Sequence, residues 1–119
     1  MFLIDSNIII YSYSYEYLRK IIIDSDVYVS EISRVEVLGY HRLTNSEEIY
    51  FGAVFELVPI LLPDAGIYDK AIEIRRAYNL KLGDSLIAAT ALQNDLSIYT
   101  RNLNDFEKID GLICINPVR

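Results

Sequence analysis

Short apolar runs alternate with longer helical patterns along this chain, and this alternation constrains the fold more than any other feature. Strands are expected at residues 2–4, 27–29, 57–60, 97–100 and 112–115. These runs are mostly apolar, as in strands that are covered on both faces. Because helical patterns separate the runs, we expect an α/β fold: a three-layer α/β/α sandwich with a mostly parallel sheet of about five short strands. In such sheets, sites form at the carboxyl ends of the strands.

The helical patterns span about 8–17, 30–43, 45–56, 64–79 and 83–94. The fourth segment places Ile67, Ala71 and Ile74 on one face, which predicts an amphipathic helix that stops near Asn79. The last is apolar nearly all round and is therefore expected to be buried. The chain has no linker, repeat or low-complexity tract, so we expect one domain over residues 1–119.

Charge and cysteine content narrow the function class. The formal net charge of -6 argues against a general nucleic-acid coat, because non-specific affinity comes from Lys and Arg. Nucleases that use hard cations nevertheless need carboxylates, so the acidic excess is compatible with one. The single Cys114 lies in an apolar run and is expected in the core as a reduced thiol. With no signal peptide or membrane span, we expect a soluble cytoplasmic protein.

Four acidic residues occupy positions that favour a site. Asp5 directly follows the first expected strand, and Asp105 lies in the loop after the strand that ends at Thr100. Glu36 and Asp84 lie beside apolar helical residues, and we expect both carboxylates to be drawn toward the interior. Gathered carboxylates repel one another, and no cluster of Lys or Arg lies nearby in the sequence to neutralise them. A divalent metal is the natural counter-ion, and an all-oxygen set favours Mg²⁺ or Mn²⁺ over zinc.

Four sequence blocks together carry a family pattern. They are MFLIDSN at 1–7, SRVEVLG at 33–39, GDSLIAAT at 83–90 and YTRNLNDF at 99–106. Their order and spacing resemble the VapC-type PIN domains, the toxin ribonucleases of prokaryotic toxin–antitoxin pairs. The resemblance covers essentially the whole chain, and its specificity comes from the four blocks in order.

The resemblance implies roles for individual residues. The first three family acids correspond to Asp5, Glu36 and Asp84, with Ser6, Asn7 and Thr100 as hydrogen-bonding supports around Asp5. The position just after Thr100 and Arg101, where many PIN domains have Asp, is Asn102 here. We therefore assign the fourth acid to Asp105, with Asn102 as a neutral metal ligand. This departure leaves open whether one or two metal ions bind, because an amide oxygen binds Mg²⁺ more weakly than a carboxylate.

The resemblance also implies an activity and partners. The expected activity is Mg²⁺-dependent endoribonuclease cleavage that leaves 3′-hydroxyl and 5′-phosphate ends, carried out by a homodimer that a small antitoxin protein inhibits. On an acidic protein the RNA substrate needs a local basic strip. The candidates are Arg34, Arg42, Arg75, Arg76, Lys81 and Arg101, of which we favour Arg101 and Lys81.

Structural interpretations of the same residues remain open. Asp5 and Asp84 are suited to cap helices, Glu36 to a solvated helix face, and Asp105 to a local turn. His41 matches no metal spacing and is expected at the surface or in a dimer contact. The tyrosines concentrated in residues 11–17 could stack on bases, but a packing or protein-interface role is favoured.

Other function classes fit less well. A haloacid-dehalogenase phosphatase needs an acid where Asn7 stands, and a response-regulator receiver needs a Lys on the last strands. The serious alternative is a catalytically inactive PIN-fold scaffold that binds RNA or protein.

Overall fold

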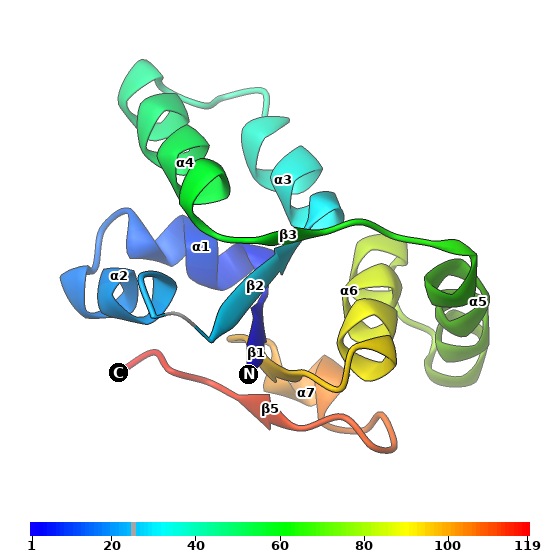
Figure 1. Ribbon diagram of the computed structural model, residues 1–119. Coiled ribbons are helices and arrows are strands. Elements are labelled where there is room, and N and C mark those ends of the chain that lie inside the picture. The colour runs from blue at the N-terminus through cyan, green and yellow to red at the C-terminus, as the bar shows by residue number, and fades with distance from the viewer. Residues whose placement is uncertain (25) are drawn as a thin grey trace.

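The computed structural model describes residues 1–24 and 26–119, which form a five-stranded sheet flanked by helices (Figure 1). The strands are β1 (Phe2–Ile4), β2 (Val27–Ser30), β3 (Ile60–Leu61), β4 (Ser97–Tyr99) and β5 (Cys114–Ile115). The helices are α1 (Ser6–Ser12), α2 (Glu16–Ile22), α3 (Glu31–Leu38), α4 (Asn45–Leu57), α5 (Ala65–Tyr78), α6 (Leu82–Gln93) and α7 (Leu103–Phe106).

The strand order is β3-β2-β1-β4-β5, and each neighbouring pair is parallel. The chain moves in one direction from β1 to β3 and then returns to the other side of β1 for β4 and β5. The strand order therefore reverses between β1 and β4, which is where ligands bind in open parallel sheets. The expected α/β sandwich is confirmed, and its sheet is entirely parallel.

Two apolar cores lie on opposite faces of the sheet (Figure 1). On one face, α1, α2, α4 and the end of α3 cover side chains such as Ile4 and Val29. On the other, α5, α6 and the segment after β4 cover Leu3 and Ile98. Helix α6 is buried over most of its length, as its apolar sequence predicts. Alternate residues of the short strands thus point into different cores.

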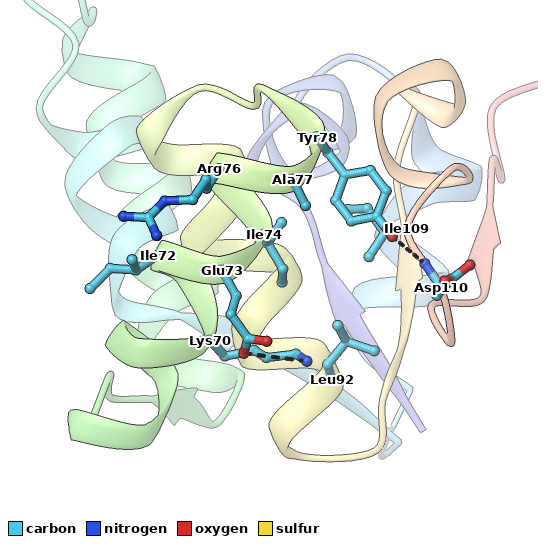
Figure 2. A pocket seen from close by; sticks show the side chains of 10 residues that line it. All are labelled: Lys70, Ile72, Glu73, Ile74, Arg76, Ala77, Tyr78, Leu92, Ile109 and Asp110. Carbon is cyan, nitrogen blue, oxygen red and sulfur yellow. Dashed lines mark hydrogen bonds and ion pairs between the residues drawn. The ribbon is translucent and has the colours of Figure 1, made fainter.

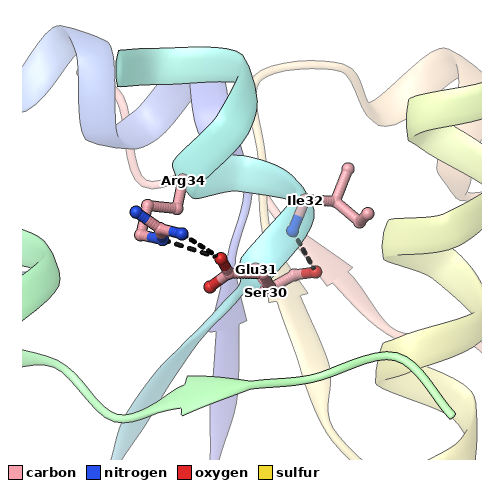
Figure 3. A network of polar contacts seen from close by, with 4 residues as sticks. All are labelled: Ser30, Glu31, Ile32 and Arg34. Atoms are coloured by element: carbon pink, nitrogen blue, oxygen red, sulfur yellow. Dashed lines mark hydrogen bonds and ion pairs between the residues drawn. The ribbon is translucent and has the colours of Figure 1, made fainter. Parts of the chain in front are cut away.

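Local side-chain chemistry sets the helix ends. Ser30 caps α3 by accepting a hydrogen bond from the Ile32 amide at 3.1 Å (Figure 3). Thr44 and Glu47 form a reciprocal capping box at the start of α4. Helix α5 ends at Asn79, which adopts the left-handed conformation with φ of 53°, as the sequence predicts.

The first helical pattern is two helices, and the prediction of one helix over residues 8–17 was wrong. The Ser12 hydroxyl donates to the Ile9 carbonyl at 2.6 Å, and the Arg19 guanidinium donates to the carbonyls of Ser12 and Tyr13. These bonds satisfy carbonyls at the end of α1, so the chain turns and α2 begins at Glu16.

Other boundaries also differ from the sequence prediction. Helix α3 ends at Leu38 instead of near residue 43, because Gly39 terminates it and a Cβ there would collide with the Val35 carbonyl. The third strand lies at Ile60–Leu61, since α4 continues through Leu57. Cys114 is half-buried on the edge strand β5 and not in the core, and burial raises the pKa of its thiol to about 11. Within the described ranges, no helix has the length and apolar content that a bilayer crossing requires.

Candidate active site

The candidate site lies at the carboxyl ends of β1 and β4, where the strand order reverses. Ile4 pairs with Tyr99 in the sheet, and the Asp5 amide donates to the Tyr99 carbonyl at 2.9 Å. Asp5 and Thr100 therefore leave adjacent strands at the same level. The sheet register brings together two residues that are 95 positions apart in the sequence.

Asp5 is a buried carboxylate, with 5% of its surface exposed. One oxygen accepts from the Ser6 amide at 2.8 Å, which makes Asp5 the N-cap of α1, and the other accepts from the Thr100 hydroxyl at 2.8 Å. Burial raises the pKa of Asp5 from 3.8 to about 6, and the charges of Asp84 and Glu36 add to this rise, while the two hydrogen bonds oppose it. The capping role and a role in the site therefore coexist.

Thr100 connects the two sides of the site. Its hydroxyl donates to Asp5 and accepts from the Asn102 amide at 2.9 Å, and the side-chain nitrogen of Asn7 lies 3.5 Å away. The Asn7 side-chain oxygen accepts from the Arg101 amide at 3.2 Å. Asn7 thus supports Asp5 indirectly, by fixing the turn after β4.

Glu36 reaches the site from α3. Its Oε1 accepts from the Ser6 hydroxyl at 2.7 Å, and the Ser33 hydroxyl lies 2.9 Å from that of Ser6. Its Oε2 lies against Gly83, where an added Cβ would approach it to 2.7 Å. The prediction of an interior position was wrong, because Glu36 is exposed. The Ser6 side chain accordingly supports Glu36 and not Asp5.

Asp84 lies in the first turn of α6 and is half-buried. Lys81 is the N-cap residue, so the alternative interpretation of Asp84 as the cap is wrong. Burial raises the pKa of Asp84, as do the charges of Asp105 and Glu36, whereas Lys81 lowers it. An acid in the first helical turn also lies at the positive end of the macrodipole.

Asp105 lies in α7 instead of the loop that the sequence predicts. Its Oδ2 accepts a hydrogen bond from the Asn102 side-chain nitrogen at 2.7 Å. An amide has one nitrogen and one oxygen, so this bond leaves the Asn102 oxygen as the atom suited to a cation. Asn102 and Asp105 therefore act as a pair on the exposed side of the site.

This oxygen-rich arrangement is suited to a hydrated hard cation. Across residues 1–24 and 26–119, no three His, Cys, Asp or Glu side chains converge closely enough to hold a metal ion directly. Mg²⁺ keeps several waters and typically binds through one or two carboxylates, so a looser acidic cluster fits it. The small Gly83 surface also leaves room for Glu36 within the cluster.

The basic residues are distributed unevenly around the site. Arg101 is exposed, and its guanidinium lies 3.9 Å from the centroid of the Tyr11 ring. Arg34 is occupied by an ion pair with Glu31, which raises the pKa of Arg34 (Figure 3). In the described part of the chain, the ion pairs within 4.0 Å are Arg34–Glu31 and Lys70–Glu73, so no basic side chain pairs directly with the site carboxylates.

A separate hollow of about 520 Å³ lies beside α5 (Figure 2). Its lining includes Ile72, Arg76 and Tyr78 of α5 and Asp110, whose amide donates to the Tyr78 hydroxyl at 3.2 Å. Arg76 thus faces this hollow, which contains none of the four candidate acids. We place the chemistry at the carboxylates because only that site combines perturbed acids with a strand-order reversal.

Sequence reasoning missed three contributors. Ser33 is a buried hydroxyl next to Ser6, Gly83 accommodates Glu36, and Tyr11 contacts Arg101. Ser33 and Glu36 are three positions apart on α3, so both lie on one face of the helix. This spacing could have indicated that Ser33 lies beside Glu36 and its partner Ser6. The contacts of Gly83 and Tyr11 depend on the tertiary fold.

Comparisons with known proteins converge on one family. The model of the family described as PIN domain matches residues 2–112. Ribonuclease VapC1 from Rickettsia felis is 30% identical over 96 residues, which cover 71% of this chain and 72% of that protein. A toxin–antitoxin complex from Klebsiella pneumoniae superimposes with a TM-score of 0.83 at 26% identity, covering 100% of this chain and 99% of the other. FitAcB from Neisseria gonorrhoeae gives 0.80 at 27% identity, covering 98% of each chain.

Proposed function

The chain belongs to the PIN domain family as a VapC-type member, and on this premise we propose that it is a Mg²⁺-dependent endoribonuclease, the toxin of a toxin–antitoxin pair. The observation that carries the proposal is the group formed by buried Asp5 with Glu36, Asp84 and Asp105. Burial, and after it the charges of the neighbouring acids, raise the pKa values of Asp5 and Asp84, and no basic side chain among the described residues forms an ion pair with them within 4.0 Å. Because these carboxylates repel one another, a cation that binds among them stabilises the folded protein.

Asp5, Glu36, Asp84 and Asp105 would surround a hydrated Mg²⁺, with one or two of the carboxylates and the neutral Asn102 oxygen as direct ligands and the others acting through its waters. Mn²⁺ has the same ligand preference. The bound ion supplies positive charge for the scissile phosphate and makes an attacking water more acidic. The side chains of the protein itself orient the carboxylates. Thr100 orients Asp5 and Ser6 orients Glu36 through hydrogen bonds of 2.8 and 2.7 Å. Such supporting bonds keep charged ligands in place before the ion arrives.

Arg101 and Lys81 are the cations best placed for RNA phosphates. Arg101 follows Thr100 directly, and Lys81 is close enough to Asp84 to lower the pKa of that carboxyl group. Each lies beside the carboxylates without forming an ion pair with them within 4.0 Å, in the part of the chain that the structure describes. Both can therefore contact substrate while the acids hold the metal ion.

An antitoxin partner is part of the proposal. The similar structure from Klebsiella pneumoniae is a toxin–antitoxin complex. In this chain, a groove of about 260 Å³ runs beside Glu36, between α1, α3 and α4, with Ile10, Val37, Tyr40 and Phe51 in its lining. An apolar groove that borders the acids offers a protein inhibitor both anchoring surface and access to the site. The homodimer stays a prediction.

The second candidate function is an inactive scaffold, which the Asn102 substitution favours. Against it, the residues that support Asp5 and Glu36 are intact and hydrogen-bonded. A scaffold has no need for a buried Asp5 whose charge is repelled by neighbouring acids.

RNA cleavage by the purified chain tests the proposal. We expect Mg²⁺ or Mn²⁺ to support cutting of a structured-RNA pool, EDTA to stop it, and Asp5→Ala and Asp84→Asn to abolish it. Asp69→Asn, an exposed acid on α5, is the matched control and should cut normally. Absence of cutting by folded, metal-binding wild type across diverse RNAs would favour the scaffold.

A further inference from the structure

Five side chains form a continuous series of ring and guanidinium contacts that starts next to the carboxylates. The Arg101 guanidinium lies 3.9 Å from the Tyr11 centroid, and the Tyr11 and Tyr15 rings stack at 5.9 Å and 14°. Tyr15 contacts Tyr17 at 5.9 Å, and the Arg119 guanidinium lies 4.6 Å from the Tyr17 centroid. We call Arg101, Tyr11, Tyr15, Tyr17 and Arg119 the aromatic track. It has a guanidinium at each end and tyrosine rings between them.

One end of the aromatic track is fixed to the candidate site. The Arg101 amide donates to the Asn7 side chain, and Arg101 follows the Thr100 that holds Asp5. The other end is fixed by the Arg119 amide, which donates to the Tyr17 hydroxyl at 3.0 Å. The C-terminal segment accordingly ends beside α2 (Figure 1). The track therefore leads away from the carboxylates along α1 and α2.

The track is accessible to solvent at its two guanidinium ends and at Tyr15, whereas the neighbouring aromatic cluster has no exposed ring. Tyr13 and Tyr50 pack with the buried Phe51 and belong to the core edge. In the track, Arg101 and Arg119 are exposed and Tyr15 keeps 44% of its surface exposed. Tyr15 is the N-cap residue of α2 but makes no side-chain capping bond, so the helix does not depend on its ring. The Tyr15 ring is therefore free to contact a ligand, whereas Tyr11 and Tyr17 are half-buried and pack against the core with part of their surface exposed.

We propose that the aromatic track is a subsite for the nucleotides that flank the scissile phosphate of the RNA substrate. This inference rests on the proposed nuclease function. The guanidinium groups contact phosphates, and bases pack against the exposed tyrosine surface, the combination by which proteins hold unpaired nucleic acid. Stacked Tyr11 restricts the Arg101 side chain and keeps its charge beside the site, so less conformational freedom is lost when RNA binds.

Charge favours RNA over a protein partner on this surface. The chain carries a net charge of -6, so RNA needs local cations, and each end of the track carries an exposed Arg. Glu16 is the acid within residues 11–17, and it lies in the first turn of α2, where the helix dipole offsets its charge. The sequence alone favours a protein interface for these tyrosines, so the two interpretations make opposing predictions.

RNA affinity separates the two interpretations. The measurement is fluorescence anisotropy of a labelled single-stranded RNA oligonucleotide with the non-cleaving Asp84→Asn protein. Tyr15→Leu should weaken binding about 10-fold, while Tyr15→Phe, which keeps the ring, should bind within about twofold of the parent. Arg119→Gln should also reduce the salt dependence of binding by about one phosphate contact. Tyr68→Leu is the matched control, because Tyr68 is 49% exposed on α5 and should leave affinity unchanged.

Failure of the track and failure of the nuclease proposal give different results. If the wild type cuts RNA and Tyr15→Leu neither weakens binding nor raises KM, the track is overturned and the nuclease stands. If Tyr15→Leu weakens binding but the wild type cuts no RNA, the nuclease and the assignment to a scissile phosphate are overturned, and the track stands as an RNA-binding surface alone. A Tyr15→Leu protein that keeps its RNA affinity but changes from dimer to monomer in light scattering identifies a protein interface and overturns the track.

Discussion

Asp5 and Asp105 are the same residue type at the same edge of the sheet, but their surroundings differ. Asp5 is 5% exposed, and the main-chain amide of Ser6 and the buried hydroxyl of Thr100 fix its two oxygens. Asp105 is half-buried in the short α7, and its carboxylate accepts a hydrogen bond from Asn102, three residues away. The sheet positions the first carboxylate, whereas a local segment positions the second.

This difference indicates that Asp5 and Asp105 have different roles in the site. A buried carboxylate is costly without a cation, so in the proposed nuclease Asp5 would determine where the metal ion binds. Asp105 and Asn102 are half-buried and thus more accessible than Asp5, so water can replace a lost ligand there at modest cost. The family position that differs here, Asn102, therefore falls on the more tolerant side. This division predicts a graded response to substitution.

The largest difference is expected between Asp5→Asn and Asp105→Asn. Asp5→Asn should lower the single-turnover cleavage rate by about 1000-fold or more, because it removes the charge that most requires the ion. Asp105→Asn should cost about 10-fold, because Asn102 and water remain as ligands. Single-turnover cleavage rates of both variants at saturating Mg²⁺ test this expectation. Equal losses would show that the two carboxylates contribute alike.

The Thr100 hydroxyl is the next test, because it links the buried and exposed sides. Thr100→Val should reduce cleavage about 10- to 100-fold, as the loss of a residue that orients a metal ligand does. The Thr100 bond lowers the pKa of Asp5, so without it that pKa rises and the loss should be greater at pH 6 than at pH 8. Rates measured at both pH values check this.

Thr90→Val is the control for the Thr100 substitution. Thr90 is equally buried in α6, but its hydroxyl bonds to the Leu86 carbonyl and not to a site residue. It should change stability without a pH-dependent change in cleavage. A similar pH dependence in both valine variants would contradict the proposed role of Thr100.

Stability of the metal-free protein should depend on pH through Asp5. The folded-state pKa of about 6 exceeds the unfolded value of 3.8, so the folded protein binds the proton more tightly. The Asp5 contribution to stability is present in full below pH 3.8 and is lost as pH rises through 6, by about 3 kcal/mol in all. Urea unfolding in EDTA measures it as the difference between wild type and Asp5→Asn.

Mg²⁺ should restore the stability that the metal-free protein loses as pH rises, but only at pH values at which Asp5 is ionised. Mg²⁺ should raise the melting temperature of the wild type at pH 7.5 and much less at pH 5, because the ion competes with the proton. Asp84→Asn should leave the metal-free protein equally or more stable, since it removes repulsion with Glu36 and Asp105. A metal-induced shift that is the same at both pH values would place the ion elsewhere.

The sequence predicts the sheet better than it predicts the site. The apolar runs around Leu3 and Ile98 determine strands in any parallel sheet, so the fold class and the location of Asp5 follow from local pattern. The break after Ser12 and the early end of α3 depend on single side-chain bonds and on Gly39, which periodicity does not detect.

The site details depend on contacts across long sequence separations. Glu36 looks interior from its apolar neighbours, yet α3 turns it toward solvent and Ser6, 30 residues away, binds it. The support of Asp5 by Thr100 follows from the β1–β4 register, which no local pattern encodes. The family resemblance therefore identifies Thr100 as a partner of Asp5, but the exposure of Glu36 and its bond to Ser6 could not be predicted from the sequence.

The smallest expected effect is that of a substitution at Gly83, which tests whether cleavage requires Glu36 to keep its present position. Gly83→Ala places a Cβ 2.7 Å from Glu36 Oε2, so the end of this flexible side chain must move. Alanine also favours the helix by up to about 1 kcal/mol. We therefore expect a protein that is as stable as wild type or more so, yet cleaves RNA about 10-fold more slowly.

Gly52→Ala in α4 separates these two effects, because an added Cβ there meets nothing within 4 Å. It should stabilise the protein by a similar amount and leave cleavage unchanged. Melting temperatures and cleavage rates for both variants check the pair. If Gly83→Ala cleaves as fast as Gly52→Ala, the position of Glu36 is as adjustable as that of Asp105, and the requirement for fixed geometry is confined to Asp5 and the residues that hold it.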